Sequence, residues 1–280
     1  MTWILIHLYF ERKKQMIKKT LLKGISAAML LTLGMSMTAC GKKEEKNKET
    51  FTVGFDAAFP PYGYMDEEGE YVGFDLDLAA EVCERRDWKL VKQPIDWDSK
   101  DFELESGNID CIWNGFTMNG RMDDYTWSEA YVDNTQVFVV RKDSGISSFE
   151  DLEGKIVTVQ TASSALDALN SDDCKELTES FKKLEEIPDY NQAFMNLEAG
   201  AVQAIAMDVG VAKYQLEQRG NDYVMLEEPI ITEQYGVGFY KGNEELRDQV
   251  QETLDEMEAD GTLAKIAEKW GLSDSIILGE

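Results

Sequence analysis

The chain has 280 residues, a length that allows one large domain or two lobes of about 120 residues. With 43% hydrophobic residues, 29% charged residues and five prolines, it has a globular composition, which excludes a chain that is disordered throughout or built from many membrane spans. The 54 acidic residues outnumber the 28 basic ones, and a net charge of −26 argues against nucleic acid as a partner. The one histidine, His7, lies in a stretch that we expect to be removed. Histidine-activated nucleophiles and histidine metal sites are therefore not expected, and no metal or cofactor motif is present.

Residues 16–40 have the layout of an export signal. Two lysines precede an apolar run over residues 24–37, and small residues then lead to Cys40. The apolar run is shorter than the roughly 20 residues that a stable membrane-spanning helix needs. We therefore expect residues 1–39 to be a signal peptide, with the true start near Met16.

Cys40 lies in the sequence Thr-Ala-Cys-Gly, which resembles a bacterial lipobox. The resemblance implies that Cys40 carries a lipid such as palmitate and is the first residue of the mature protein. The alternative is a buried cysteine that follows an ordinary helix. The charged residues 40–50 contain almost no apolar side chains, so we expect them to form a tether to the membrane.

From Phe51 onward, strand and helix patterns alternate, which is typical of α/β architecture. The expected strands cover residues 51–55, 109–113, 135–140, 155–160, 204–207 and 235–240. We expect a first helix capped by Asp75, with Leu76, Ala79, Val82 and Cys83 on its apolar face. A second helix is expected over Ser164–Leu169. A third begins at a cap formed by Asp189 and ends at Gly200, and an amphipathic helical region covers 246–270.

The pattern restarts after the polar, turn-rich residues 141–145, which predicts two α/β lobes. Two strands, near 135–140 and 232–241, lie on either side of a middle segment. We expect the chain to pass between the lobes along these two strands, which would form a hinge. We therefore expect lobe 1 to be discontinuous, built from residues 51–139 and 235–280, with residues 140–234 as lobe 2.

Three cysteines follow Cys40 in the sequence. Cys83 and Cys111 lie in apolar patterns, where packing is the simplest interpretation, and Cys174 is the third. An odd number allows at most one disulfide among them. We assign them no functional role.

Four segments resemble a known family. They are DAAFPPYGYMDEEGEYVGFDLDLAAEV (56–82), WNGFTMNGR (113–121), WSEAY (127–131) and LAKIAEKWG (263–271). Their order and spacing resemble those of extracellular solute-binding protein family 3, the substrate-binding components of polar amino acid ABC transporters, from about Phe51 to Leu272. The resemblance implies a type II periplasmic-binding-protein fold, in which two lobes joined by two hinge strands close over an amino acid.

A zwitterionic ligand needs a fixed cation for its carboxylate and a fixed anion for its ammonium group. Arg121 offers a planar fork that matches a carboxylate, and it resembles the family arginine at this place. The alternative for Arg121 is a surface residue on a polar turn. Gly115 and Thr117 follow a strand, and we expect them to offer the ligand a backbone N–H and a hydroxyl.

The resemblance places three residues of lobe 2 at the ligand. Ser164 stands where the family has its carboxylate-binding threonine, although Ser163 and Ser164 are also suited to cap a helix. Asp208 aligns with the family aspartate that accepts a hydrogen bond from the ligand ammonium, and it follows four apolar residues. Its alternative is an exposed loop position. Gln160 falls where relatives contact the distal end of the ligand side chain.

Three residues of lobe 1 complete the expected site. Phe59 and Trp97 match positions where family members hold the ligand side chain between aromatic faces, although both are also ordinary core residues. Asp56 falls near the distal end of that side chain. Its carboxylate would accept hydrogen bonds from an amide, amine or guanidinium group and would disfavour an acidic side chain.

We therefore expect a monomeric, lipid-anchored receptor on the outer face of the cell membrane. It would bind a polar, neutral or basic L-amino acid by hinge closure and present the closed form to an ABC permease, with no bond broken. Glutamine, arginine, lysine and cystine all remain open as ligands. One alternative is a dehydratase-like enzyme on the same fold, which would need an acid or base such as Asp56 or Asp208. Another is an amino acid sensor ectodomain, which would call for a membrane span and a cytoplasmic module.

Overall fold

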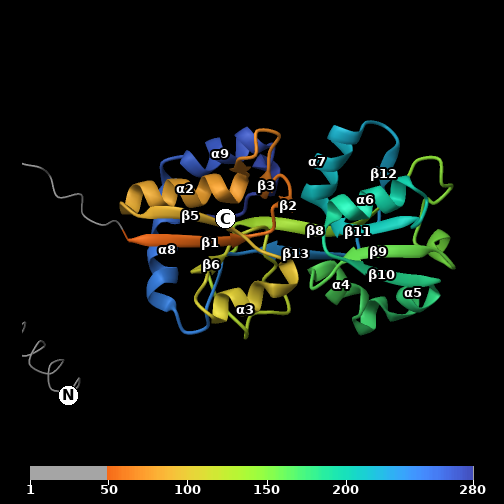
Figure 1. Cartoon of the computed structure of the whole chain (residues 1–280), viewed down its shortest axis with the longest axis horizontal. Coiled ribbons are helices and arrows are strands. Elements are labelled where there is room, and N and C mark those ends of the chain that lie inside the picture. Colours follow the sequence, from red (N-terminus) through yellow and green to blue (C-terminus); the bar gives the residue numbers. More distant parts are fainter. Residues whose placement is uncertain (1–48, 280) are drawn as a thin grey trace, which may run out of the picture. The chain divides into compact units, whose positions relative to one another are not determined.

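The computed structural model describes residues 49–279 of the chain. The expected signal peptide, Cys40 and most of the expected tether lie outside the described residues. Within residues 49–279, no helix is long and apolar enough to cross a membrane. The described part contains two mixed sheets flanked by helices, and each sheet belongs to one lobe (Figure 1).

Lobe 1 is built on a sheet with the strand order β5-β1-β6-β14-β7. These strands are β1 (Thr50–Phe55), β5 (Lys89–Pro94), β6 (Cys111–Ile112), β7 (Thr126–Trp127) and β14 (Gly238–Phe239). The helices of this lobe are α2 (Phe74–Arg86), α3 (Lys100–Glu105), α8 (Glu244–Ala259) and α9 (Thr262–Trp270). In Figure 1, α2 and α9 cover one face of the sheet and α3 lies on the other. A small sheet of β2 (Ala58–Phe59), β3 (Gly63–Met65) and β4 (Tyr71–Val72) adjoins it.

Lobe 2 is built on a sheet with the order β10-β9-β11-β8-β12, to which β13 adds by pairing with β8. Its strands are β8 (Val132–Arg141), β9 (Ile156–Gln160), β10 (Lys183–Ile187), β11 (Ala204–Asp208), β12 (Tyr223–Met225) and β13 (Ile231–Tyr235). The helices are α4 (Ser164–Leu169), α5 (Lys175–Ser180), α6 (Tyr190–Glu198) and α7 (Val209–Arg219). Figure 1 shows α4 and α5 on one face of this sheet and α6 and α7 on the other.

The chain passes from one sheet to the other twice. The first passage lies between β7, which ends at Trp127, and β8, which begins at Val132; the second lies between β13, which ends at Tyr235, and β14. β8 and β13 pair antiparallel along five residues, and Val132 faces Tyr235 at the end of the pair that adjoins the first lobe. The sequence predicts that lobe 1 extends to residue 139 and resumes at residue 235. In the structure β8, which begins at Val132, lies in the sheet of lobe 2 over its whole length, so the first boundary falls earlier than predicted.

Local expectations hold in most elements and are wrong in two. Asp75 does not cap α2, because Gly73 occupies the cap position and the Asp75 carboxylate accepts hydrogen bonds from the Gly115 N–H and the Tyr131 hydroxyl. The strand expected over 235–240 is divided at Gly236, where a β-carbon would lie 2.6 Å from the Met118 sulfur. The cap expected at Asp189 is present, since its carboxylate accepts the Gln192 N–H at 2.9 Å.

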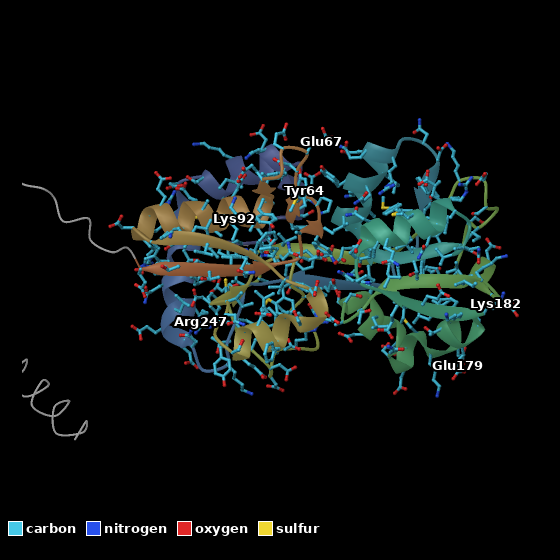
Figure 2. All side chains as sticks on the ribbon, viewed as in Figure 1. Tyr64, Glu67, Lys92, Glu179, Lys182 and Arg247 are labelled. Carbon is cyan, nitrogen blue, oxygen red and sulfur yellow. The ribbon has the colours of Figure 1, made fainter. Side chains whose placement is uncertain are left out.

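Apolar side chains fill the space between sheets and helices, while charged side chains point outward around both lobes (Figure 2). Glu179 and Lys182, for example, lie at the outer end of lobe 2 in that view. Cys83 and Cys111 are buried in the core, Cys174 is half-buried, and all three are free thiols. The core thus accounts for Cys83 and Cys111 by packing alone.

Candidate functional site

A narrow cleft between the lobes, called the inner cleft here, gathers the ends of strands from both sheets. Nine residues line it: Phe59, Trp97, Gly115, Thr117, Arg121, Gln160, Ser163, Ser164 and Asp208. Eight of them are residues that the sequence predicts to contact the ligand, and the ninth, Ser163, is one that the sequence suits to a helix cap. Gln160 and Asp208 are the last residues of β9 and β11, which run parallel, so the cleft lies at the carboxyl edge of the sheet of lobe 2.

Arg121 extends from lobe 1 to lobe 2. Its Nη2 lies 2.6 Å from a carboxylate oxygen of Asp167 on α4 and 3.5 Å from the carbonyl oxygen of Ala162. The Asp167 carboxylate is largely exposed, whereas the Arg121 side chain is mostly buried. A guanidinium has five N–H donors, so the bonds to Asp167, Ala162 and Thr117 leave further donors on a side chain that lines the cleft. Arg121 is therefore a partly buried cation that lines the cleft rather than a free surface residue.

Asp208 is buried, with 4% of its surface exposed, and ends β11 as the sequence predicts. Its Oδ1 accepts hydrogen bonds from the amides of Asn134 and Gln136, at 2.9 and 2.7 Å, and from the Tyr235 hydroxyl. Burial and the neighbouring Glu233 carboxylate raise the pKa of Asp208 to about 7. The Asp208 carboxylate therefore accepts hydrogen bonds from three neutral donors, while burial and the Glu233 charge favour its protonated form.

Gly115 lines the cleft, but its N–H is not available to a ligand. It donates to Asp75 at 2.6 Å, which corrects the expectation that this N–H faces the bound molecule. Gly115 has a φ of 57°, and a β-carbon there would lie 2.9 Å from the Phe59 ring, so only glycine fits without displacement. The Thr117 hydroxyl lies in the cleft and donates to Glu233 at 2.8 Å.

Asp56 and Gln160 join the two lobes by a hydrogen bond. The Gln160 amide donates to the Asp56 carboxylate at 2.7 Å and to the Pro188 carbonyl at 3.0 Å. Burial raises the pKa of Asp56 to about 6, against the opposing effect of bonds from Ala58 and Gln160. Asp56 lies at the end of β1 and borders the inner cleft through Gln160 rather than lining it.

Phe59 and Trp97 both serve as cleft wall and as core. Phe59 is 6% exposed and packs against the Tyr190 ring at 5.9 Å, while Trp97 is 9% exposed and meets the Phe116 ring edge-on at 5.6 Å. Both line the inner cleft. The two interpretations of each aromatic residue are therefore compatible.

Ser163 and Ser164, at the start of α4, have different hydrogen-bond partners. Ser163 is the helix cap, since its oxygen accepts the Leu166 N–H at 3.2 Å. Ser164 turns its hydroxyl to the cleft floor, where it accepts from Gln136 at 3.0 Å and donates to Glu233 at 3.1 Å. Ala162 adopts the left-handed region, with φ 56°, and its carbonyl faces the cations of lobe 1.

Four residues of this region were missed by sequence reasoning. Glu233 and its donors Asn134 and Gln136 come from β13 and β8, and all three are buried. The signal for them was the polar residues within the two expected crossing strands. Lys100 is 4% exposed, and its Nζ lies 3.4 Å from the Ala162 carbonyl and 5.4 Å from the Trp97 ring centre. Burial lowers its pKa, and the nearby Arg121 lowers it as well.

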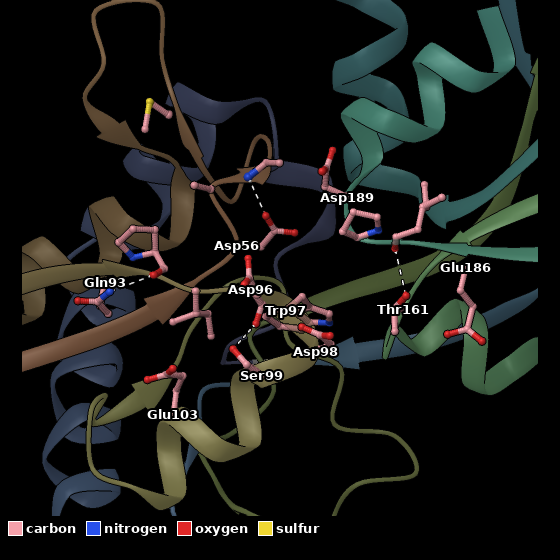
Figure 3. Close-up of a pocket in the computed structure, with 17 residues that line it drawn as sticks. Asp56, Gln93, Asp96, Trp97, Asp98, Ser99, Glu103, Thr161, Glu186 and Asp189 are labelled. Carbon is pink, nitrogen blue, oxygen red and sulfur yellow. Dashed lines mark hydrogen bonds between the residues drawn. The ribbon is translucent and has the colours of Figure 1, made fainter. Parts of the chain in front are cut away.

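A larger cleft, called the outer cleft here, adjoins the site and measures about 830 Å³ (Figure 3). Asp56 and Trp97 belong to it, and the residues that line it include no lysine, arginine or histidine. Its acidic residues come from both lobes: Asp56, Asp96, Asp98, Glu103, Glu186 and Asp189. This lining attracts cations and repels anions.

The chain matches the family described as bacterial extracellular solute-binding proteins, family 3, over residues 51–273. It is 31% identical to the L-cystine-binding protein TcyA of Bacillus subtilis over 231 residues, which cover 80% of this chain and 82% of that protein.

Solved structures similar to this chain are also amino acid-binding proteins. A histidine-bound substrate-binding protein of an ABC uptake transporter from Streptococcus pneumoniae is 34% identical with a TM-score of 0.75, and the match covers 79% of this chain and 92% of that one. An ancestral arginine-binding protein bound to arginine is 35% identical with a TM-score of 0.73, covering 80% and 99%.

One similar structure bears on enzymatic activity. It is the ancestral amino acid-binding protein AncCDT-1, described as a precursor of cyclohexadienyl dehydratase, with 30% identity, a TM-score of 0.71 and coverage of 79% and 95%. The similar folds are therefore those of amino acid-binding proteins, including one that preceded an enzyme.

Proposed function

Because this chain belongs to the bacterial extracellular solute-binding proteins of family 3, with their two-lobed type II fold, we propose that it is the substrate-binding component of an ABC importer for polar amino acids. One observation carries the proposal: Arg121 of lobe 1 and Asp208 of lobe 2 line the same small cleft. A molecule that bridges them needs an anion and a cation a few bonds apart, which is the structure of an α-amino acid.

Each cleft residue then has a role toward the ligand. Arg121 binds the α-carboxylate, and Asp208 accepts from the α-ammonium group. Phe59 and Trp97 enclose the side chain, and Asp56 meets its distal end. Because the ligand contacts both lobes, it stabilises their closed arrangement, and closure is a shift between two populations.

The outer cleft supports a choice among ligands. One of its six carboxylates is Asp56, which we propose meets the distal end of the ligand side chain, and the other five lie around Asp56 (Figure 3). Side chains with a cationic or neutral polar end fit there, and acidic side chains are repelled. We propose that arginine, lysine, glutamine or cystine is bound and that glutamate and aspartate are rejected.

The protein would act outside the cytoplasm as a monomer, held to the membrane by a lipid on Cys40, and deliver its ligand to a permease. The family to which it belongs is extracellular, which supports the location. The lipobox-like sequence supports the anchor. Metabolic labelling with a palmitate analogue tests this step, and Cys40→Ala should abolish the label and release the protein from membranes.

The test of the main proposal is a thermal-shift screen of the twenty L-amino acids, ornithine and cystine with the purified protein. A ligand at a hundred times its Kd adds about 2.7 kcal/mol to the stability of the folded state, which corresponds to a rise in Tm of about 5 to 10 °C for a chain of this size. We expect such a rise with at least one cationic or neutral polar amino acid and none with glutamate. A screen without any shift would reject the proposal.

The dehydratase-like alternative has one structural point in its favour: the buried carboxyl groups Asp56 and Asp208 have raised pKa values of about 6 and about 7, as a general acid requires. Prolonged incubation with the tightest ligand, followed by denaturation and mass analysis, separates the two functions. Recovery of unchanged ligand supports a binding protein, and a loss of 18 Da supports a dehydratase.

A further inference from the structure

Glu233 is a second buried carboxylate beside Asp208, and the proposed ligand contacts do not use it. It lies on β13 with 4% of its surface exposed. One oxygen, Oε1, accepts four hydrogen bonds from neutral groups: the hydroxyls of Thr117 (2.8 Å) and Ser164 (3.1 Å) and the amides of Asn134 and Gln136 (both 2.8 Å). No cation among these donors balances its charge.

The same two amides hold both carboxylates. Asn134 and Gln136 each donate from one nitrogen to Asp208 Oδ1 and to Glu233 Oε1. With their nitrogens committed to the acids, the oxygens Asn134 Oδ1 and Gln136 Oε1 are buried and without a hydrogen-bond partner in the described part of the chain. The network therefore contains two acids and two free acceptors, which is a surplus of acceptors over donors.

Such a surplus calls for a donor that carries positive charge. Asp208 does not ionise readily beside Glu233, because burial and the neighbouring carboxylate raise the pKa of Asp208. Either a proton or an ammonium group relieves the repulsion. An ammonium group supplies three N–H donors and one positive charge, and Asp208 already lines the cleft where the ligand ammonium is proposed to lie.

We propose that Asp208, held beside Glu233 by the same two amides, carries a proton in the ligand-free protein and releases it to solvent when the ammonium group of the amino acid binds. This inference rests on the proposed function and adds Glu233 to its site as a positioning residue. The ammonium group keeps its own proton, so the balance is one ligand bound and one proton set free. The raised pKa of Asp208, about 7, agrees with a proton held near neutral pH.

Other titratable groups face the pair and must be separated from it. The tyrosines Tyr62, Tyr190 and Tyr235 have raised pKa values and stay neutral below pH 8, while Arg121 and Lys100 are cations of the cleft region. Two acids, Asp56 and Asp75, also have raised pKa values, of about 6 and about 7. Asp56 is proposed to meet the ligand, so it is the competing source of a released proton.

The experiment is isothermal titration calorimetry with L-arginine and L-glutamine, whose side chains do not titrate between pH 5 and 7.5. Titrations at pH 5.5, 6.5 and 7.5 in buffers of low and high ionisation enthalpy give the number of protons released. We expect close to one proton at pH 5.5, fewer at 7.5, and an affinity that rises up to about tenfold per pH unit below the pKa of Asp208.

Glu233→Gln is the diagnostic variant, because its amide oxygen still accepts from the four donors of Oε1. We expect it to move the pH dependence at least one unit toward acid and to halve or abolish proton release at pH 6.5. Glu228→Gln, an exposed glutamate in the loop before β13, is the matched control and should release as many protons as the wild type. Asp56→Asn measures the contribution of Asp56.

Three results would overturn the inference: binding without proton release from pH 5.5 to 7.5, an unchanged proton count in Glu233→Gln, or a count lost only in Asp56→Asn. The first needs no variant, so a Glu233→Gln protein that fails to fold still leaves a decisive measurement. Failure of the proposed function has a different signature, since no amino acid would then bind at any pH. In that case the inference falls with it.

Discussion

Arg121 shows how one side chain couples the two lobes. Its guanidinium starts in lobe 1 and contacts Asp167 and the Ala162 carbonyl in lobe 2. Asp167 is largely exposed and screened by solvent, so this ion pair contributes little stability by itself. A ligand carboxylate in the closed cleft would be shielded from water and would depend on Arg121 far more strongly.

We therefore expect Arg121→Ala to weaken amino acid binding by about 2 to 5 kcal/mol, which is at least 30-fold, because it leaves a ligand carboxylate unpaired in the cleft. Calorimetry with the ligand found in the thermal screen measures the loss. Arg141→Ala is the control, since Arg141 pairs locally with Asp143 on the surface, and it should bind as the wild type does. Wild-type affinity in Arg121→Ala would reject the assignment.

At the scale of elements, helix α7 of lobe 2 packs closely on the small sheet of lobe 1. Tyr214 of α7 donates to the Tyr64 hydroxyl at 3.2 Å, and Tyr64 lies on the side of lobe 1 that faces lobe 2 (Figure 2). Tyr62 of lobe 1 lies against Gly210, in the first turn of α7. A β-carbon at position 210 would lie 2.5 Å from the Tyr62 hydroxyl. Tyr62 is buried, so it has little freedom to move away.

Gly210→Ala should therefore hinder closure without harming either lobe. Overpacking a close contact costs about 1 to 3 kcal/mol, and we expect ligand affinity to fall by about 5-fold to about 160-fold. Alanine favours a helix by up to about 1 kcal/mol over glycine, so the Tm of the ligand-free protein should not fall. Glu217→Ala, an exposed change on the same helix, is the control. A lower ligand-free Tm with unchanged affinity would contradict this account.

At the scale of the whole molecule, buried acids dominate the response to pH. Burial raises the pKa values of Asp56, Asp75 and Asp208 to about 6, 7 and 7, above the value of about 3.9 expected in the unfolded chain. Between pH 4 and 7 the folded protein then binds more protons than the unfolded chain, so stability is lost as pH rises through the folded pKa values.

We accordingly expect the ligand-free protein to be more stable at pH 5 than at pH 8, measured by urea denaturation. Moderate salt screens the mutual repulsion of the surface acids, which would act in the same direction. Asp75→Asn should flatten the dependence, because its amide can accept from Gly115 and donate to Tyr131 without titrating. Stability that increases from pH 5 to pH 8 in salt would contradict the prediction.

The sequence by itself determined the alternation of strands and helices, the positions of most elements and eight of the nine residues of the inner cleft. The elements follow from local periodicity and capping, and most of the cleft residues follow from the resemblance of the motifs to those of the family. Asp189 at its cap and Asp208 at the end of β11 are examples in which neighbours in sequence fix the residue's place.

Only the tertiary structure decided which groups those residues contact. Asp75 was expected to cap a helix but bonds to Gly115, 40 residues away, and Glu233 bonds to Thr117 across 116 residues. Lys100 shows no sequence pattern that separates it from a solvated lysine, yet it is buried against the opposite lobe. Contacts of this kind depend on how two sheets face one another, a geometry set by the packing of the whole chain, which no local period or motif encodes.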